Sequence, residues 1–495
     1  MRRWLAAFAT AVPLVHGAAA AQSPCILFDP TYGVSSPFWN YQSLVVGDLD
    51  GQNGPDVCIL APGRVGVFLN RGNGTFDVRS EFVWWFNSYE TCAVLIDIER
   101  DGDLDLVVGK GFGNPLVLLN DGRGRMVVQG KGVYFADEVG IGAFAAGDVD
   151  GDGFDDLVGG GGRGAPARLF LNTGAGRFVD VTATHMPVLT TGVGELAAVD
   201  LDADGDLDFP FAGGASGPTP EYNGILWNDV AGRMRLQTLQ GTRRRHTTVS
   251  VGDIDGDGRP DLFFGSSEGA ELWLNLGGGA FFDGSQLLGN ATSAICSAFG
   301  DVDGDGMPDL VVCSFIGEAH VELHRNLGLQ QGFVRDTLGV SQPHSRFTVL
   351  RMFLRDMDRD GDLDLVSQGG PPIPYVLGLW IGVNTARHVL PRANPSIGAP
   401  WAVALWAQPG QFMLPLFGTA RADLDLTPIG RLGLDPASLV VLPPISIRAQ
   451  PQYLTLTVPS NPRLVGQTFY WQGLVVDPAQ PNLPRLTNWM GGLMR

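Results

Sequence analysis

Lysine is almost missing from this chain of 495 residues, since Lys110 and Lys131 are the only two. Charged residues make up 17% of the sequence, against about a quarter in typical soluble domains. The formal net charge is −19. A protein that binds nucleic acid needs a basic surface for the phosphates, so these numbers exclude nucleic acid as a partner. Two interpretations of the negative net charge remain: the carboxylates cluster at particular places, or the surface is uniformly acidic.

Cysteine is also scarce. The five cysteines are Cys25, Cys58, Cys92, Cys296 and Cys313. None has the C-x-x-C spacing of a zinc or redox site. An odd count leaves at least one thiol without an intramolecular partner. Cys296 precedes Asp301 by five residues and Cys313 follows Asp309 by four, so a hairpin between them would bring the two thiols to within about one residue of register.

Long apolar runs are missing beyond the N-terminus. Arg2 and Arg3 precede the uncharged stretch 4–15, and Ala19–Ala21 offers a small-residue cleavage site. This pattern predicts a signal peptide over residues 1–21. No later run reaches the length of about 18 apolar residues that a membrane span needs. We therefore expect a secreted or cell-surface protein without a membrane span.

Glycine is abundant, with 69 residues, but has no collagen period. Instead an acidic nonapeptide recurs seven times, at 48–56, 97–105, 148–156, 200–208, 253–261, 301–309 and 356–364. An apolar run precedes each copy and two or three more follow it, separated by Gly-rich turns. Each period of about 50 residues therefore predicts four short strands, which is one blade of a β-propeller.

The predicted fold class is all-β, with a seven-bladed propeller over residues 22–390. The seventh repeat has a weak fourth strand, and residues 25–34 read as a strand that completes it. The acidic motif stops near residue 391. Short apolar runs and frequent prolines over 391–495 predict a C-terminal β-sandwich.

The nonapeptide itself predicts a calcium site. Asp at positions 1, 3, 5 and 9 places carboxylates on one side of the loop, the carbonyl at position 7 adds an oxygen, and Gly at position 6 turns the chain. The apolar residue at position 2 should anchor the loop in the core. Calcium takes six to eight oxygens, whereas magnesium keeps more water and zinc prefers His or Cys. Position 12 lacks the Glu of an EF-hand, and six copies in phase argue against a merely solvated acidic turn.

The predicted ligands follow these positions. They are Asp97, Glu99, Asp101, Asp103 and Asp105; Asp148, Asp150, Asp152, Phe154 and Asp156; Asp200, Asp202, Asp204, Asp206 and Asp208; Asp253, Asp255, Asp257, Arg259 and Asp261; Asp301, Asp303, Asp305, Met307 and Asp309; and Asp356, Asp358, Asp360, Asp362 and Asp364. The first copy has Gln52 at position 5 and Asn53 at position 6. Its acids, Asp48, Asp50 and Asp56, are expected to form a weak or empty seventh site.

The repeat resembles the FG-GAP/VCBS repeat of integrin α chains and of many exported bacterial proteins, over roughly residues 25–390. Phe299-Gly300 and Gly164-Ala165-Pro166 match the motifs that name the family. The resemblance implies a propeller whose acidic loops bind Ca²⁺ and whose ligands meet the opposite face. The region 391–495 is similar to a β-sandwich tail of exported repeat proteins.

Two loop sets would occupy that opposite face. Their candidate ligand-contacting residues are Trp84, Trp85, Tyr89, Tyr222, Arg244, His246, Arg346 and Phe347. The tryptophans could instead pack between blades. The arginines could instead lie on a solvated loop. The histidines form no recognisable nucleophile–base pair, and Glu195, Glu221, Glu268 and Glu318 show no motif. We expect a non-enzymatic binding or adhesion module for a glycan or protein. A polysaccharide-active enzyme and a structural cell-surface protein are the alternatives.

Overall fold

The structure is a computed structural model that describes Phe28–Asp29 and most of residues 43–493. The larger gaps are 84–89, 215–221, 240–245, 337–350, 370–377, 392–399 and 458–467, and shorter ones include 303–305 and 358–361. The expected signal peptide and most of 25–34 lie outside the described residues. The chain divides into two units, one of 30–355 and 365–382, the other of 1–29, 356–364 and 383–495.

Four-stranded antiparallel sheets repeat along the first 384 residues. In chain order their strands are β2 (Ser43–Gly47), β3 (Asp56–Ala61), β4 (Arg64–Asn70) and β5 (Phe76–Val83); β6 (Glu90–Ile96), β7 (Asp105–Lys110), β8 (Leu116–Leu119) and β9 (Val127–Val128); β10 (Ile141–Gly147), β11 (Asp156–Gly161), β12 (Arg168–Asn172) and β13 (Phe178–Asp180); β14 (Val193–Leu196), β15 (Phe209–Gly213), β16 (Gly224–Asn228) and β17 (Met234–Thr238); β18 (Thr248–Gly252), β19 (Asp261–Gly265), β20 (Ala270–Gly277) and β21 (Ala280–Asp283); and β22 (Cys296–Gly300), β23 (Asp309–Ile316), β24 (Glu318–Asn326) and β25 (Phe333–Asp336). This repeated arrangement is that of a β-propeller and confirms the all-β fold class.

One further sheet has the order β1-β28-β27-β26. Its strands are β1 (Phe28–Asp29), β26 (Met352–Arg355), β27 (Asp364–Gly369) and β28 (Gly378–Asn384). Phe28 lies opposite Asn384 and Asp29 opposite Val383, antiparallel. A strand from the N-terminus thus supplies the fourth position of this sheet, the place where the sequence lacks a strong fourth strand.

The second strand of each sheet is the most buried element. Every residue of β7, β11, β15 and β19 is buried. Their sequences, such as DLFFG, are mainly apolar, because neighbouring sheets cover both of their faces. Small residues allow close approach at one face, as at Gly160, where an added Cβ would lie 2.9 Å from Val193.

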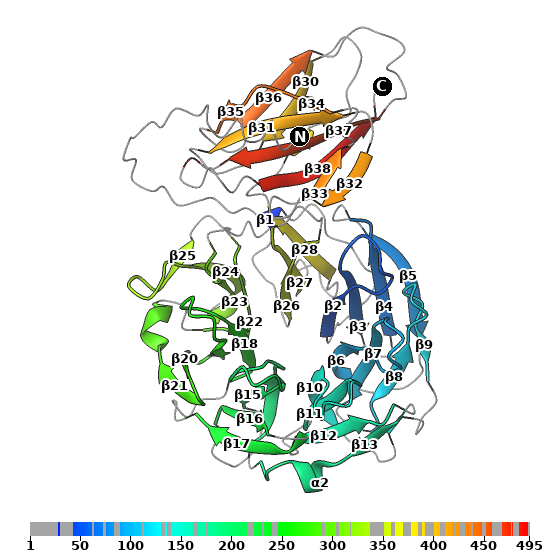
Figure 1. The fold of residues 1–495 in the computed structure, drawn as a ribbon, viewed down its shortest axis with the longest axis vertical. Coiled ribbons are helices and arrows are strands. Elements are labelled where there is room, and N and C mark those ends of the chain that lie inside the picture. The colour runs from blue at the N-terminus through cyan, green and yellow to red at the C-terminus, as the bar shows by residue number, and fades with distance from the viewer. Residues whose placement is uncertain are drawn as a thin grey trace. The chain divides into compact units, whose positions relative to one another are not determined.

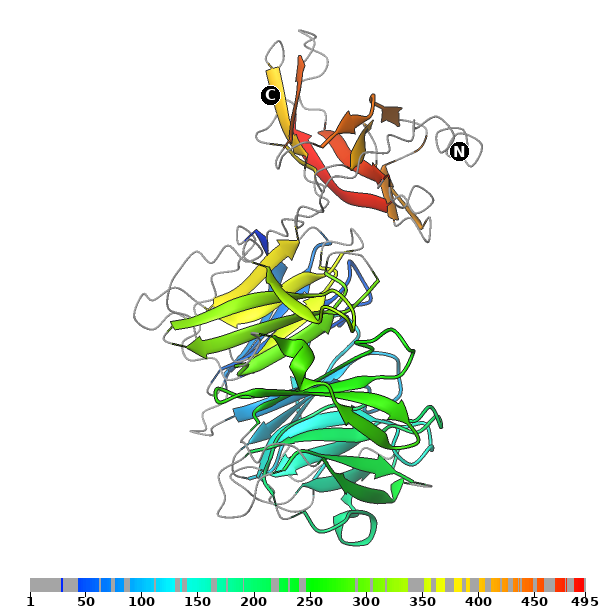
Figure 2. The ribbon, with the colours of Figure 1, turned by 90° about the vertical axis from the view of Figure 1, so that its left-hand side faces the viewer.

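The innermost strands β2, β6, β10, β14, β18, β22 and β26 contact one another in that order. The sheets of this unit therefore follow one another around a common centre (Figures 1 and 2). Each apolar cluster lies between two successive sheets. One joins Val45, Val67 and Leu69 to Leu106 and Leu118, and another joins Phe263 and Leu272 to Leu310 and Val312. The sheets are thus held face to face by side chains rather than by shared strands.

Two short helical turns, α2 (Thr182–His185) and η4 (Ser285–Leu288), follow outer strands. No helix among the described residues is long and apolar enough to cross a membrane.

The described residues after 388 form three antiparallel sheets. They contain β29 (Val389–Pro391), β30 (Pro400–Leu405) and β36 (Gln452–Thr457); β31 (Phe412–Gly418), β34 (Val440–Val441), β35 (Ile445–Ser446), β37 (Thr468–Val476) and β38 (Arg485–Leu493); and β32 (Arg421–Asp425) with β33 (Arg431–Leu434). Leu416, Leu434 and Leu474 form its buried cluster, and Trp471 packs against Phe417.

Candidate metal sites

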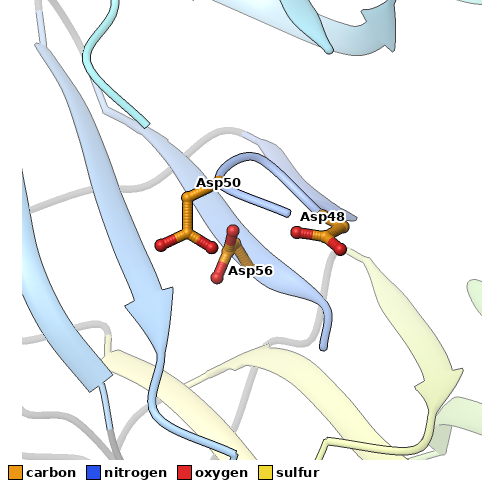
Figure 3. A group of neighbouring side chains, drawn as sticks. All are labelled: Asp48, Asp50 and Asp56. Carbon is orange, nitrogen blue, oxygen red and sulfur yellow. The ribbon is translucent and has the colours of Figure 1, made fainter. Parts of the chain in front are cut away.

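Three carboxylates converge in each of four acidic loops. They come from positions 1, 3 and 9, and in each group one ligand oxygen per residue lies within 4.8 Å of the others. The groups are Asp48, Asp50 and Asp56; Asp148, Asp150 and Asp156; Asp200, Asp202 and Asp208; and Asp253, Asp255 and Asp261. In the first loop, between β2 and β3, the carboxylates of Asp50 and Asp56 lie next to each other beneath the turn (Figure 3). An all-oxygen donor set of this kind fits a hard divalent cation.

Side chains of the loop hold its own backbone in shape. In the fifth copy, Asp253 accepts hydrogen bonds from the backbone N–H of Gly256 at 2.9 Å and of Gly258 at 2.9 Å. The Asp255 carboxylate accepts from Asp257, and the Asp257 carboxylate accepts from Arg259. Gly258 has φ +88°, which only glycine adopts without strain. The turn predicted at position 6 is therefore confirmed, and it places the carboxylates around one point.

The Asp at position 9 is buried at the base of each loop. Asp261 is 0% exposed and accepts two backbone N–H bonds, from Ile254 at 2.7 Å and from Asn275 at 2.7 Å. Burial raises the pKa of Asp261 to about 6, against the opposing effect of these two hydrogen bonds, and Asp255 and Asp257 raise it further. The equivalent Asp56, Asp105, Asp156 and Asp208 have a pKa raised to about 7, again mainly by burial. A bound cation would stabilise the ionised form of these carboxylates.

The position-2 residues are buried as predicted. Leu49, Ile98, Val149, Leu201, Ile254, Val302 and Met357 are each at most 3% exposed. Their backbone N–H groups donate to the position-9 carboxylate in all seven copies, with distances of 2.7–3.1 Å. The apolar side chain and the buried carboxylate together fix the base of each loop.

In five of the repeats, an asparagine at or near the end of the third strand links the loop to the preceding sheet. The Asn172 backbone N–H donates to Asp156 at 2.7 Å, and its side-chain Nδ2 donates to the Ile98 carbonyl at 2.9 Å. Ile98 is position 2 of the preceding loop. The same bond to the preceding sheet is made by Asn120, Asn228, Asn275 and Asn326. We call this set of bonds the asparagine clamp. Its role was missed from the sequence, although the recurrent Asn-x-Gly signalled it.

The second loop differs in geometry. All of its residues are described, but Asp97, Glu99 and Asp105 do not form a group like those of the other four loops. Asp97 Oδ1 accepts from the N–H of Asp101 at position 5. Position 1 of the third, fourth and fifth loops accepts from position 4, and in the fifth loop Asp253 accepts from position 5 as well. Glu99 was expected to reach the site through its longer side chain. Its charge does raise the pKa of Asp105, but the three acids do not converge as they do in the other loops.

The first loop is closer to the other copies than its sequence suggests. Asp48, Asp50 and Asp56 converge although Gln52 replaces an aspartate. Asn53 has φ +60° and Gly54 φ +96°, so the displaced glycine still completes the turn. The acids at position 5, Asp101, Asp152, Asp204 and Asp257, lie outside the converging groups. In the sixth and seventh loops Asp303, Asp305, Asp358 and Asp360 lie outside the described residues, while Asp301, Asp309, Asp356, Asp362 and Asp364 are described.

Most of the proposed ligand-contacting residues lie outside the described residues, namely Trp84, Trp85, Tyr89, Arg244, Arg346 and Phe347. Tyr222 is half-buried and its ring meets Phe211 edge-on. His246 corrects our expectation, because it is 1% exposed and its Nδ1 lies 3.0 Å from Asn223 Nδ2. It therefore belongs to the packed interior between β16 and β18 rather than to an exposed loop.

Two acids outside the loops have structural partners. Glu195 forms an ion pair with Arg351 and also accepts the N–H of Val249. Glu271 is 5% exposed and accepts the indole N–H of Trp273 at 3.3 Å. Both carboxylates are thus engaged in holding inner parts of the sheets.

Comparison with known proteins identifies the repeats. Residues 48–108, 97–159, 148–209 and 253–312 each match the FG-GAP-like repeat. Every match begins at one acidic loop and ends near the second strand of the next sheet. The chain therefore carries FG-GAP-like repeats, in the region where the four-stranded sheets repeat. No curated protein matches the chain.

Three solved structures illustrate what the chain is similar to at low sequence identity. An Agrocybe aegerita lectin that recognises non-reducing terminal N-acetylglucosamine is 20% identical, covers 60% of this chain and 79% of its own, and has a TM-score of 0.43. BBS1N, solved in complex with ARL6DN, is 14% identical, covers 74% of this chain and 99% of its own, and has a TM-score of 0.46. The Photorhabdus luminescens Tc holotoxin pore is 15% identical over 92% of this chain and 20% of its own, with a TM-score of 0.34.

Proposed function

We propose that the chain is an exported calcium-binding β-propeller of seven blades that serves as a binding or adhesion module for a glycan or protein ligand. The observation that carries the proposal is the convergence of three carboxylates in four loops that recur in phase. Like charges at this spacing repel each other, and a divalent cation would remove that repulsion. The family match over the same loops supports the choice of calcium.

In this proposal the cation is structural. The carboxylates of positions 1, 3 and 9 hold it, and the position-5 carboxylate and position-7 carbonyl complete the shell on binding. Because the position-9 Asp also holds the third-strand asparagine, an ordered loop helps to fix the sheet and its predecessor. The loops at the other ends of the strands then offer a ligand surface on a stable frame.

The metal part is tested with loop variants. Asp253→Asn combined with Asp255→Asn should remove one equivalent of bound calcium, measured by titration calorimetry and by mass spectrometry of the native chain. Adding calcium to the EDTA-treated wild type should raise Tm by several degrees, since each site adds about 2.7 kcal/mol at 100-fold over Kd. Magnesium should do less.

Asp229→Asn is the matched control, because Asp229 is an exposed acid outside the loops that lies 3.8 Å from Arg235. It should leave the stoichiometry unchanged. A wild-type melt that is the same in EDTA and in calcium, with no bound metal, would refute the calcium proposal.

The binding part is tested separately. The calcium-loaded chain is screened on glycan and peptide arrays, and any hit is assayed for turnover. Binding without turnover supports the module. Cleavage of a bound polysaccharide would instead show that the chain is an enzyme.

A further inference from the structure

Two cysteines face each other across the first hairpin of the sixth sheet. Cys296 begins β22 and lies directly opposite Cys313 of β23 in the antiparallel register. The next pairs are Ser297 with Val312 and Ala298 with Val311. Side chains of directly opposite residues project from the same face of a sheet. The two cysteines are therefore in exact register, without the one-residue offset that the sequence left open. Both thiols project from the same face of the sheet.

We propose that Cys296 and Cys313 form a disulfide during oxidative folding. Opposite residues of an antiparallel pair have Cα atoms about 4.5–5.5 Å apart, and a disulfide spans Cα separations of about 4.4–6.8 Å. The bond therefore needs no change of register. Both side chains are buried, with exposures of 5% and 0%.

The other described cysteines lie opposite residues that are not cysteines. Cys58 lies opposite Val45 on one side and Val67 on the other, and Cys92 lies opposite Gly109. Among the strand registers that the structure describes, only Cys296 and Cys313 pair cysteine with cysteine. This singles them out from the ten possible pairs among the five cysteines.

The oxidation is a thiol–disulfide exchange with a small-molecule or protein disulfide. One cysteine thiolate attacks the sulfur of the oxidant, which releases one thiol and leaves a mixed disulfide. The second thiolate attacks the cysteine sulfur of that mixed disulfide. The Sγ–Sγ bond between Cys296 and Cys313 then forms, and the second thiol of the oxidant leaves. The two cysteines lose two protons and two electrons, and the oxidant disulfide gains them.

Burial determines when this step can occur. Once the hairpin is packed, burial and the neighbouring Cys313 thiol raise the pKa of Cys296 well above its usual range. The reactive thiolate is then rare. We therefore expect oxidation while the hairpin forms and slow reaction in the folded chain, in either direction.

The disulfide would close the segment 297–312, which contains the acidic loop Asp301–Asp309. Cross-linking a loop of this length lowers the conformational entropy of the unfolded chain. The bond lies five residues along the strand from the acidic loop, about 17 Å away, so it would fix the hairpin without entering the carboxylate cluster.

The test refolds the full chain in a buffer of reduced and oxidised glutathione, denatures it in iodoacetamide, and maps its peptides by mass spectrometry. We expect one cross-linked peptide joining Cys296 to Cys313, which separates on reduction. Variants C58S and C92S should keep this peptide. The oxidised wild type should melt several degrees above the reduced chain and exchange the amides of β22 and β23 more slowly.

Two outcomes would overturn the proposal. One is a folded, cooperatively melting chain in which Cys296 and Cys313 are both alkylated after oxidation. The other is a cross-link from either cysteine to Cys25, Cys58 or Cys92. Both can be read from the wild type alone, so they do not depend on whether a cysteine variant folds.

Discussion

Position 4 of the acidic loop shows how a single residue can carry strain. Gly51, Gly151 and Gly256 hold this position with φ between +68° and +77°, but Ala203 holds it at +61° and Arg100 at +58°. A residue with a Cβ pays about 1–2 kcal/mol for this left-handed conformation. The fourth loop therefore stores strain that the third and fifth loops avoid.

Replacing Ala203 with glycine should relieve that strain. We expect Ala203→Gly to raise the free energy of unfolding by about 0.5–1 kcal/mol, since the relief exceeds the greater unfolded-state freedom of glycine. Urea unfolding measures the change. Gly205→Ala, at φ +99° in the same loop, is the control and should destabilise the chain. A variant A203G that unfolds earlier than the wild type would contradict the argument.

At the same scale the sequence predicted some residues well and others not. The spacing of Asp and Gly predicted the carboxylates of positions 1, 3 and 9 that converge in four loops, but it also predicted the position-5 carboxylates, which lie outside these groups. It did not predict that Asp97, Glu99 and Asp105 fail to converge in the second loop. It also did not predict the burial of His246, which is decided by Asn223 from a different sheet.

Among the elements, the asparagine clamp ties five of the sheets to the preceding sheet. Asn172 is 1% exposed, and its removal would leave the Ile98 carbonyl buried without this donor. Its Oδ1 also accepts the N–H of Gly174. A buried polar group that loses its partner costs about 1–3 kcal/mol.

We therefore expect Asn172→Ala to lower the free energy of unfolding by about 2–3 kcal/mol. Thr173→Ala changes the adjacent exposed residue and is the matched control, expected within about 0.5 kcal/mol of the wild type. Chemical denaturation followed by far-UV circular dichroism measures both. Equal stability of N172A and T173A would show that the clamp contributes nothing.

The strands themselves were predictable, and the clamp was not. Apolar runs between Gly-rich turns occur in every period, so the four strands per repeat could be read directly. The clamp needs knowledge of which carbonyl lies opposite the asparagine, and that carbonyl is about 70 residues earlier in the chain, as from Asn172 to Ile98. The periodicity of the sequence shows that the asparagine recurs, but it does not show which carbonyl accepts its hydrogen bond.

For the whole molecule, the buried carboxylates predict an unusual pH dependence. An ordinary Asp in the unfolded chain has a pKa of about 3.9, whereas Asp56, Asp105, Asp156 and Asp208 have a folded pKa raised to about 7. The folded, metal-free chain thus binds more protons than the unfolded chain between these values. Its stability is therefore greatest at the acid end and falls as the pH rises toward 7.

The measurement is Tm in EDTA and in calcium at pH 5, 6 and 7.5. In EDTA, Tm should fall across this series. In calcium the fall should be smaller, and the gain from calcium should grow with pH, because protons compete with the metal for the same oxygens. A metal-free Tm that rises from pH 5 to 7.5 would mean that these carboxylates are already ionised in the folded chain.

The pairing of β1 with β28 has a consequence for synthesis on the ribosome. Phe28 is synthesised about 350 residues before its partner Asn384. The sheet β1-β28-β27-β26 cannot be completed until translation has passed Asn384, so the N-terminal strand must wait, unpaired, while the intervening sheets form. An unpaired strand edge is a site for aggregation. A chain cut short before that point would keep this edge exposed, and the cell could recognise the fragment as unfinished.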